Sequence, residues 1–415
     1  MSAGSTHGDG FPWRLVLLCC GAEILTMLGF ALVPTLLPVF TAEWGLSATA
    51  GGWLGGVYFL GYITAVPLLV SLTDRYDARR IYLAAASVSA LALAAFALSA
   101  RSFTPGLVCW LVAGFGLAGT YMPGLRALTD RLPIAHQSRG TAFYTASFGT
   151  GAGLSYLLLE GLGRLLPWPW LFALAAGAVV AAVLLIALSL PPKLPAGAAQ
   201  GSDSGWAGWR AVLRDRRILA FCGAYCGHNW ELFGFRSWLV AYLTWSHLQT
   251  PSALTSAPGI VAALATFLAV PASILGNEGA HRWGRSTWLR RVMSLSAVLG
   301  LAVALTGNVG NHGLWAMVLL LAYAATMNLD SAAMTAGLLT ETPAERRGKA
   351  LALYACVGFA GGFVGPVAFG IALDAFGRST SLGWSAGFVT LALGISLARL
   401  AVTRIANVAT SHRPA

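Results

Sequence analysis

Apolar segments long enough to cross a bilayer recur along the whole sequence, and this feature constrains the fold most. A membrane-spanning helix needs about 20 mostly apolar residues. Because lipid satisfies no backbone hydrogen bonds, such segments predict an all-α integral membrane protein. We place twelve spans, with eleven or thirteen as the alternatives. They are 13–40, 48–72, 81–100, 105–129, 141–162, 167–190, 217–244, 258–278, 290–307, 313–339, 350–373 and 382–403.

The composition excludes the main soluble classes. Of the 415 residues, 57% are hydrophobic and 10% are charged, whereas about a quarter of a typical soluble chain is charged. This excludes a soluble enzyme, a nucleic-acid binder and a secreted disulfide-rich domain. The net charge of +11 is therefore assigned to basic residues in membrane loops and not to nucleic-acid binding.

The basic residues also predict the orientation in the membrane. With the N-terminus inside, the cytoplasmic segments hold 20 Lys and Arg residues, and the outside loops hold three, Arg101, Arg164 and Arg378. This positive-inside bias predicts a multi-pass protein with both termini in the cytoplasm, and we expect a bacterial inner membrane. The stretch 191–216, rich in Pro, Gly, Ala and Ser before its basic end, is interpreted as a flexible cytoplasmic linker between halves 1–190 and 217–415.

The six cysteines do not form a disulfide framework, because all of them lie inside apolar runs. We interpret them as small buried hydrophobic residues. Cys222 and Cys226 are four residues apart on one helix face, which leaves a soft metal as an alternative, but no matching pair of ligands stands nearby. We therefore predict neither a metal site nor a cofactor.

Two landmarks repeat at one spacing. The basic stretch that begins at Asp74 follows span 2, and a similar stretch that begins at His281 follows span 8, about 207 residues later. Arg139-Gly140 precedes span 5, and Arg347-Gly348 precedes span 11, 208 residues later. A shared offset predicts an internal duplication, and six spans per copy give both copies the same orientation.

The loop after span 2 resembles that of the major facilitator superfamily, which carries the motif G-x-L-a-D-r-x-G-r-R. Leu72, Asp74, Arg75 and Arg79 match it. The positions that depart from it are Val70, Asp77 and Ala78. The resemblance extends over essentially the whole chain. It implies two pseudo-symmetric six-helix bundles around one central site that opens alternately to each side, and we expect a monomer.

The same loop is a candidate gate. Asp74, Arg75, Arg79 and Arg80 lie at a helix exit, where ion pairs can latch neighbouring helix ends together in one conformation. The alternative is that these basic residues only fix the topology.

Ionisable residues inside the spans are costly and mark functional sites. Glu23, His228, Glu231 and Asp330 lie roughly 13–21 Å from the nearest cytoplasmic charge, which is near mid-membrane. Arg126 lies in span 4, and an ion pair with Asp130, four residues on, is its alternative role. In the superfamily that the sequence resembles, spans 1, 4, 7 and 10 line the central cavity. Glu160 and Asp374 lie at span ends and are interpreted as interfacial.

The repeat relates two of these acids. Glu231 is 208 residues after Glu23, so we expect them to face each other across the cavity. A match of Gly29-Phe30 to Gly234-Phe235 gives an offset of 205 instead and leaves this register open.

Span 7 carries the densest polar group. His228 and Glu231 are about 60° apart on one helix face, and Arg236 lies about two turns nearer the outside. The alternative is a polar cluster that only packs helices together. The predicted substrate and proton site comprises Glu23, Arg126, His228, Glu231, Arg236 and Asp330.

These residues predict a secondary active, proton-coupled transporter of a small polar or anionic solute. The carboxylates and His228 would carry protons, while Arg126 and Arg236 would hold an anionic group or neutralise the acids. One alternative is an efflux antiporter for drugs or hydrophobic metabolites, with a broad aromatic cavity. Another is a non-transporting sensor or assembly factor. The expected partners are a small molecule, protons and lipid, and no catalytic residues are predicted.

Overall fold

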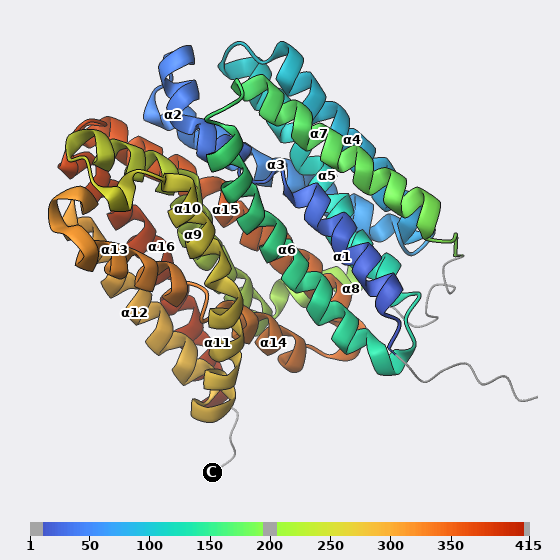
Figure 1. Ribbon diagram of the computed structural model, residues 1–415. Helices are drawn as coiled ribbons and strands as arrows, with labels where there is room; N and C mark the ends of the chain where they lie inside the picture. Colours follow the sequence, from blue (N-terminus) through green and yellow to red (C-terminus); the bar gives the residue numbers. More distant parts are fainter. Residues whose placement is uncertain (1–10, 194–205, 411–415) are drawn as a thin grey trace, which may run out of the picture.

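A computed structural model describes residues 11–193 and 206–410, and every regular element in these ranges is helical (Figure 1). In the first half, the helices are α1 Trp13–Met27, α2 Leu32–Trp44, α3 Ala48–Leu72, α4 Ala78–Ser99, α5 Phe103–Thr129, α6 Ile134–Leu162 and α7 Trp168–Ser189. In the second half, they are α8 Trp206–Arg214, α9 Arg216–Gln249, α10 Pro258–Phe267, α11 Ala269–Trp283, α12 Arg285–Thr306, α13 Val309–Thr326, α14 Ser331–Glu341, α15 Arg347–Phe376 and α16 Ser381–Thr410.

Each predicted span corresponds to one helix or to two consecutive helices. Ten helical segments of the described ranges are long and apolar enough to cross a membrane. The two further spans are α6 and α9, with 29 and 34 residues. Both are long enough to cross, but their charged and small polar residues make them less apolar than the other ten. The all-helical membrane fold is therefore confirmed.

The first span is broken between α1 and α2, and its sequence explains the break. Pro34 has no N–H to donate to the carbonyl of Phe30, four residues earlier, so the helix cannot run through this point unchanged. Ser155 of α6 binds the freed backbone. Its Oγ accepts from the Ala31 N–H at 3.1 Å and donates to the Leu28 carbonyl at 2.6 Å. A side chain of the neighbouring helix thus supplies the hydrogen bonds that lipid cannot.

The tenth span is also discontinuous, between the end of α13 and the start of α14 at Ser331. Asp330 lies at this break, and its side chain does not cap α14. The Trp288 indole of α12 donates to the Leu329 carbonyl at 3.1 Å, and the Asn328 side chain donates to the Ala324 carbonyl at 2.8 Å. Broken helices at mid-membrane are where transporters commonly place their binding groups.

The predicted linker is not wholly irregular. Its last part, in the described range, forms α8, which the flexible composition of 191–216 did not predict. Val212 of α8 is fully buried against α9 and α15, where Phe221, Ala350 and Tyr354 belong to the same cluster. Burial of one apolar side chain between charged neighbours is enough to make this short segment an amphipathic helix.

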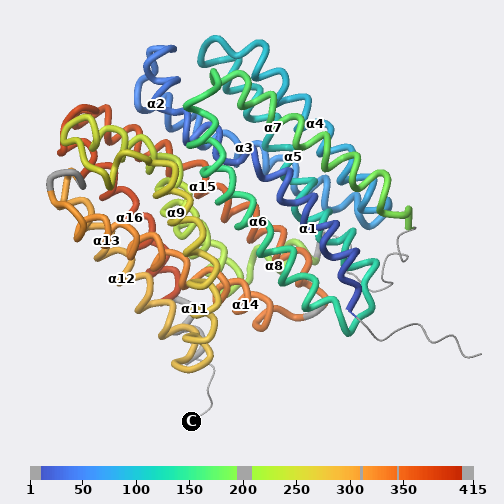
Figure 2. Tube along the Cα trace, viewed as in Figure 1, coloured from blue at the N-terminus to red at the C-terminus, as the bar shows by residue number. Residues whose placement is uncertain are grey.

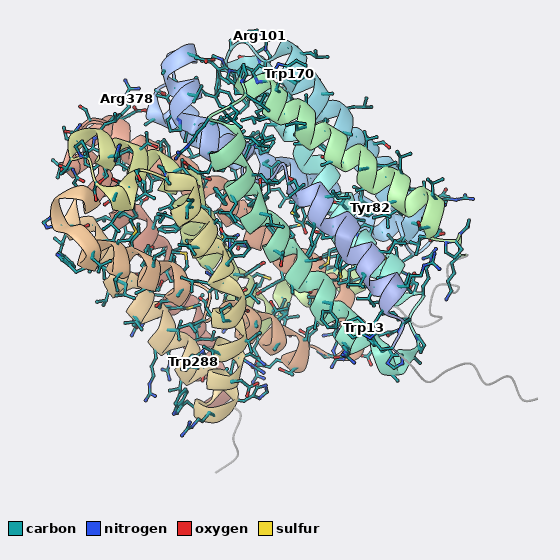
Figure 3. All side chains as sticks on the ribbon, in the orientation of Figure 1. Trp13, Tyr82, Arg101, Trp170, Trp288 and Arg378 are labelled. Atoms are coloured by element: carbon teal, nitrogen blue, oxygen red, sulfur yellow. The ribbon has the colours of Figure 1, made fainter. Side chains whose placement is uncertain are left out.

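The halves meet along α3 with α15, α6 with α10 and α2 with α9 (Figure 2). Close approach of α3 and α15 depends on small residues, because a β-carbon on Gly56 would lie 2.5 Å from the Phe363 carbonyl oxygen. Figure 3 shows Arg101 and Arg378 at one end of the molecule and Trp13 at the opposite end. We call the first of these the outer end, after the orientation that the basic residues predict.

Candidate functional site

Glu23 of α1 is completely buried inside the first half. Its Oε2 lies 2.9 Å from the Tyr144 hydroxyl of α6, which also lies 3.0 Å from the Thr120 carbonyl oxygen of α5. Its Oε1 has no hydrogen-bond partner, and no ion pair in the described ranges includes Glu23. The carboxyl group is therefore held by a hydroxyl and not by a cation.

The Tyr144 hydroxyl has a single proton and two neighbours that can use it. If Glu23 is charged, Tyr144 donates to the carboxylate. If Glu23 is neutral, its carboxyl donates to the Tyr144 oxygen and Tyr144 donates to the Thr120 carbonyl. The same positions thus suit both protonation states of Glu23.

His228 of α9 and Asp330 form a buried acid–base pair in the second half. Nδ1 and Oδ1 lie 2.8 Å apart, and both side chains are 1% exposed. The Tyr225 ring lies parallel to the imidazole at 5.8 Å and stacks on Tyr354 of α15 at 4.0 Å. The break before α14 brings Asp330 to this point on α9.

Glu231 lies one turn further along α9 and is also completely buried. Its Oε1 accepts from the Ser296 hydroxyl of α12 at 2.8 Å, and its Oε2 has no hydrogen-bond partner. His228, three residues earlier on α9, is the partner of Asp330. The second half therefore places two carboxyl groups and one imidazole in a shared, water-poor interior.

The expectation that Glu23 and Glu231 face each other across a cavity is wrong for this conformation. Glu23 is bonded to Tyr144 within the first half, and Glu231 to Ser296 within the second. Helical periodicity shows which residues share a face, but it does not say which neighbouring helix that face meets. Here each acid turns toward a hydroxyl of its own half.

Arg236 of α9 lies between the halves and is half-buried. Its guanidinium carbon is 5.8 Å from the centre of the Phe233 ring, and no ion pair of the described ranges includes it. It lines two small cavities of ≈ 10 Å³, each about the size of one water molecule. Aromatic residues form much of their walls, namely Phe30, Tyr58, Phe59, Trp110, Tyr156, Phe233 and Phe235.

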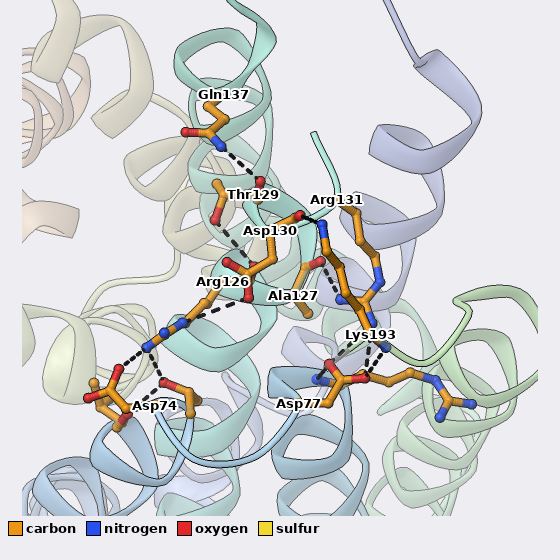
Figure 4. Close-up of polar contacts among 12 residues, drawn as sticks. Asp74, Asp77, Arg126, Ala127, Thr129, Asp130, Arg131, Gln137 and Lys193 are labelled. Carbon is orange, nitrogen blue, oxygen red and sulfur yellow. Dashed lines mark hydrogen bonds and ion pairs between the residues drawn. The ribbon is translucent and has the colours of Figure 1, made fainter. Parts of the chain in front are cut away.

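Arg126 is placed away from these residues, in the last turn of α5 (Figure 4). Its Nη1 lies 2.5 Å from Asp74 Oδ1, and its Nε lies 3.8 Å from Asp130 Oδ2. The predicted pair with Asp130 is thus present as the longer contact. Arg126 belongs to the loop network and does not reach the buried acids.

The rest of this network centres on Asp77, one of the positions that depart from the superfamily motif. Arg131 Nη2 lies 3.1 Å from both carboxylate oxygens of Asp77, and the backbone N–H groups of Arg79 and Lys193 donate to the same carboxylate at 3.0 and 2.8 Å. Burial alone would raise the pKa of Asp77, but these donors outweigh it and lower the pKa below its ordinary value. An Asp directly before a helix start signals an N-cap, and this signal was available in the sequence.

The other predicted loop residues differ in their contacts. Arg79 Nη2 donates to the Ala187 carbonyl of α7 at 2.7 Å. Arg75 and Arg80 are exposed. The pairs of Asp74 and Asp77 both join elements of the first half, so in this conformation they hold that half together.

Comparison with known proteins agrees with this architecture. The family model described as Major Facilitator Superfamily matches residues 19–366. An uncharacterized MFS-type transporter YfiU of Bacillus subtilis is 26% identical over 41% of this chain and 33% of its own length. The puromycin resistance protein pur8 of Streptomyces alboniger is 29% identical over 46% of this chain and 38% of its own length. The chain thus spans about a third of the length of these curated relatives.

A solved structure extends the similarity to nearly the whole chain. It is a bacterial homolog of the human lysosomal transporter Spinster, in an inward-facing and unoccupied conformation. It aligns with a TM-score of 0.81 over 98% of this chain and 99% of its own, at 14% sequence identity. At this identity the similarity describes the fold alone.

Proposed function

Because the chain belongs to the Major Facilitator Superfamily, we propose that it is a proton-coupled secondary transporter that moves a small molecule by alternating access. The observation that carries this proposal is the burial of Glu23 and Glu231, one in each half, beside hydroxyl groups and with no ion pair to any described residue. A charged carboxylate in such surroundings costs several kcal/mol. Each acid is therefore a neutral proton carrier here and releases its proton when its surroundings open to water.

In the first half, Tyr144 is the hydrogen-bond partner of Glu23 both before and after the acid releases its proton. It accepts from the neutral carboxyl of Glu23 while the acid is sealed, and it donates to the carboxylate once the proton has left. The proton exchange then needs only a rotation of one hydroxyl group.

In the second half, His228 and Asp330 form the second titratable unit. Two carboxyl groups buried in one interior favour a state in which at least one of them is neutral. Protonation of His228 gives Asp330 a cationic partner at 2.8 Å. Loss of that proton leaves the pair with one negative charge, so this step takes place when the interior opens to water.

The substrate contact is Arg236. Its guanidinium lies between the halves, is permanently charged and suits a carboxylate or phosphate group. A small polar or anionic solute is therefore the proposed cargo. In the proposed setting, the protein is a monomer in a bacterial inner membrane, with both termini in the cytoplasm.

Efflux of drugs or hydrophobic metabolites is the second candidate. The aromatic walls on both sides of Arg236 favour it, since such walls suit an apolar body. The name of the puromycin resistance protein also points in this direction. Expression of the chain in a drug-sensitive host separates the candidates, because only an exporter raises resistance to puromycin.

The proton mechanism is tested in proteoliposomes. A thermal-shift screen with small carboxylates, inorganic anions and cationic drugs first selects a ligand that stabilises the protein. Uptake of that ligand is then measured with and without an imposed pH gradient. We expect Glu23→Gln and Glu231→Gln to lose gradient-driven accumulation while they retain exchange of ligand across the membrane. Accumulation at the normal level in both variants would show that the proton mechanism is wrong.

The matched control is Glu43→Gln. Glu43 is a carboxylate at the outer end, where it accepts from the Trp168 indole at 2.9 Å, so its replacement leaves both buried acids unchanged.

A further inference from the structure

A carboxylate of the first half caps a helix of the second half at the outer end. Oε2 of Glu160, near the end of α6, accepts from the Gly259 N–H in the first turn of α10 at 2.7 Å. Arg164, four residues later, lies 2.6 Å from Glu160 and donates to the Ser256 carbonyl, just before α10, at 3.5 Å. Acid and arginine together hold the start of α10.

The same arrangement occurs in the opposite direction. Asp374, near the end of α15, accepts from the N–H groups of Ala48 and Thr49, in the first turn of α3, at 2.9 and 2.7 Å. Arg378, four residues later, lies 3.8 Å from Asp374 and donates to the Leu46 carbonyl, just before α3, at 2.7 Å. A carboxylate of the second half thus caps a helix of the first.

We call these two acid–arginine groups, Glu160 with Arg164 and Asp374 with Arg378, the clasps. The internal repeat relates one clasp to the other. In each, an acid near the end of the fifth span of one half and an arginine four residues later, just after that span, bind the start of the second span of the other half. Glu160 and Asp374 are 214 residues apart, as are Arg164 and Arg378. The sequence repeat has an offset of 207–208, so these are corresponding positions with a small shift in register. Two copies of one arrangement at equal sequence spacing indicate a shared role and argue against two chance contacts.

The physics of a helix start makes each clasp dependent on conformation. The first N–H groups of a helix have no partner within it, and they form the positive end of the helix dipole. A carboxylate that accepts from them is therefore stabilised. Since each carboxylate belongs to the opposite half, these bonds exist only while the outer ends touch. When the outer ends part, both helix starts exchange their carboxylate for water.

We propose that the two clasps form the outer gate of the transporter and set the balance between this conformation and one open to the outside. The proposal rests on the alternating access of the proposed function, but it requires neither a particular substrate nor proton coupling. Glu160 and Asp374 are positioning residues in it, because they act through the contact between the halves.

The test measures the separation of the outer ends directly. Spin labels are attached to Leu165→Cys and Leu248→Cys, which are 78% and 75% exposed and lie in opposite halves, in a background without the native cysteines. Distance distributions are recorded in lipid nanodiscs without substrate or pH gradient. We expect Glu160→Gln and Asp374→Asn each to raise the ratio of the long-distance to the short-distance population about three- to tenfold. The double variant should combine the two shifts.

A second variant breaks one clasp without a change of charge. A β-carbon on Gly259 would lie 2.8 Å from both Oε2 and Cβ of Glu160 and 3.1 Å from the Tyr156 carbonyl oxygen, so Gly259→Ala displaces the carboxylate and pushes α10 away from α6. It should shift the distances in the same direction as Glu160→Gln. The control is again Glu43→Gln, whose carboxylate lies at the same end but bonds within one half.

Unchanged distances in both Asp374→Asn and Gly259→Ala, with normal thermal stability, would overturn the gate. These single variants decide the matter even if the double variant is unstable. The two proposals fail separately, because a failed gate leaves the pH-driven uptake of the wild type intact. Conversely, a failed proton mechanism leaves the distance shifts unchanged.

Discussion

The imidazole of His228 and the carboxylate of Asp330 lie 2.8 Å apart at the break in the tenth span, and water reaches neither. Removal of one partner from such a buried pair leaves the other without compensation, whereas removal of both restores an apolar interior. We expect His228→Leu to destabilise the protein by about 3–5 kcal/mol. The double variant His228→Leu with Asp330→Leu should recover most of this loss. Thermal unfolding in detergent, arranged as a double-mutant cycle, measures the coupling, and additive losses would contradict it.

Tyr144 provides a second prediction. Tyr144→Phe removes the hydroxyl that bonds Oε2 of the buried Glu23 carboxyl group. We expect a loss of about 1–3 kcal/mol in stability. Gradient-driven transport should fall, because the charged form of Glu23 then loses this donor. The pH dependence of transport is the informative readout, since a purely structural role would lower the rate equally at every pH.

A third prediction concerns Asp77, the N-cap of α4. Its pKa is lowered in the folded state, so it stabilises the fold at any pH above its unfolded value of about 3.9 and loses this effect as the pH falls through the folded value. Asp77→Asn keeps a good N-cap residue but removes the charge that pairs with Arg131. We expect Asp77→Asn to lower the free energy of unfolding by about 1–2 kcal/mol at pH 7. The difference from the wild type should shrink below about pH 4.

Asp74→Asn is the matched control for that experiment. Its side chain is 60% exposed, so its ion pair with Arg126 is screened by water. We expect Asp74→Asn to lower the free energy of unfolding by less than about 1 kcal/mol. A larger loss for Asp74→Asn than for Asp77→Asn would contradict the assignment.

Much of the fold could be predicted because spans are encoded locally. Run length and loop charge are enough to place the helices, including the polar spans α6 and α9. The break in the first span was missed although Pro34 is visible in the sequence, since a proline kinks some spans and interrupts others. What decides the outcome is a hydrogen-bonding neighbour such as Ser155, and that neighbour is 124 residues from the Ala31 N–H that it binds.

The acids of the candidate site could be predicted from the sequence, but their hydrogen-bond partners could not. Counting residues from the span ends places Glu23 and Glu231 deep inside their helices, and the structure buries both side chains. Their partners Tyr144 and Ser296 could not be identified, because many hydroxyl groups occur in the spans and only tertiary packing selects among them. The contacts of Asp374 with the start of α3 also depend on tertiary packing, so the sequence indicates only an interfacial residue. A span end appears ordinary until the start of the opposite half's helix is placed beside it.

Arg236 provides the last prediction, and it separates the two candidate functions. An anion held by its guanidinium should lose roughly tenfold or more in affinity in Arg236→Gln, while Arg236→Lys should retain part of it. Thermal-shift titrations with small carboxylates measure this. The partial rescue distinguishes a charge contact from a packing role, because both replacements are flexible chains of comparable length. If cationic drugs stabilise the wild type and Arg236→Gln equally and carboxylates stabilise neither, the cargo is not an anion. The aromatic walls around this position then become the substrate contact, and efflux becomes the favoured function.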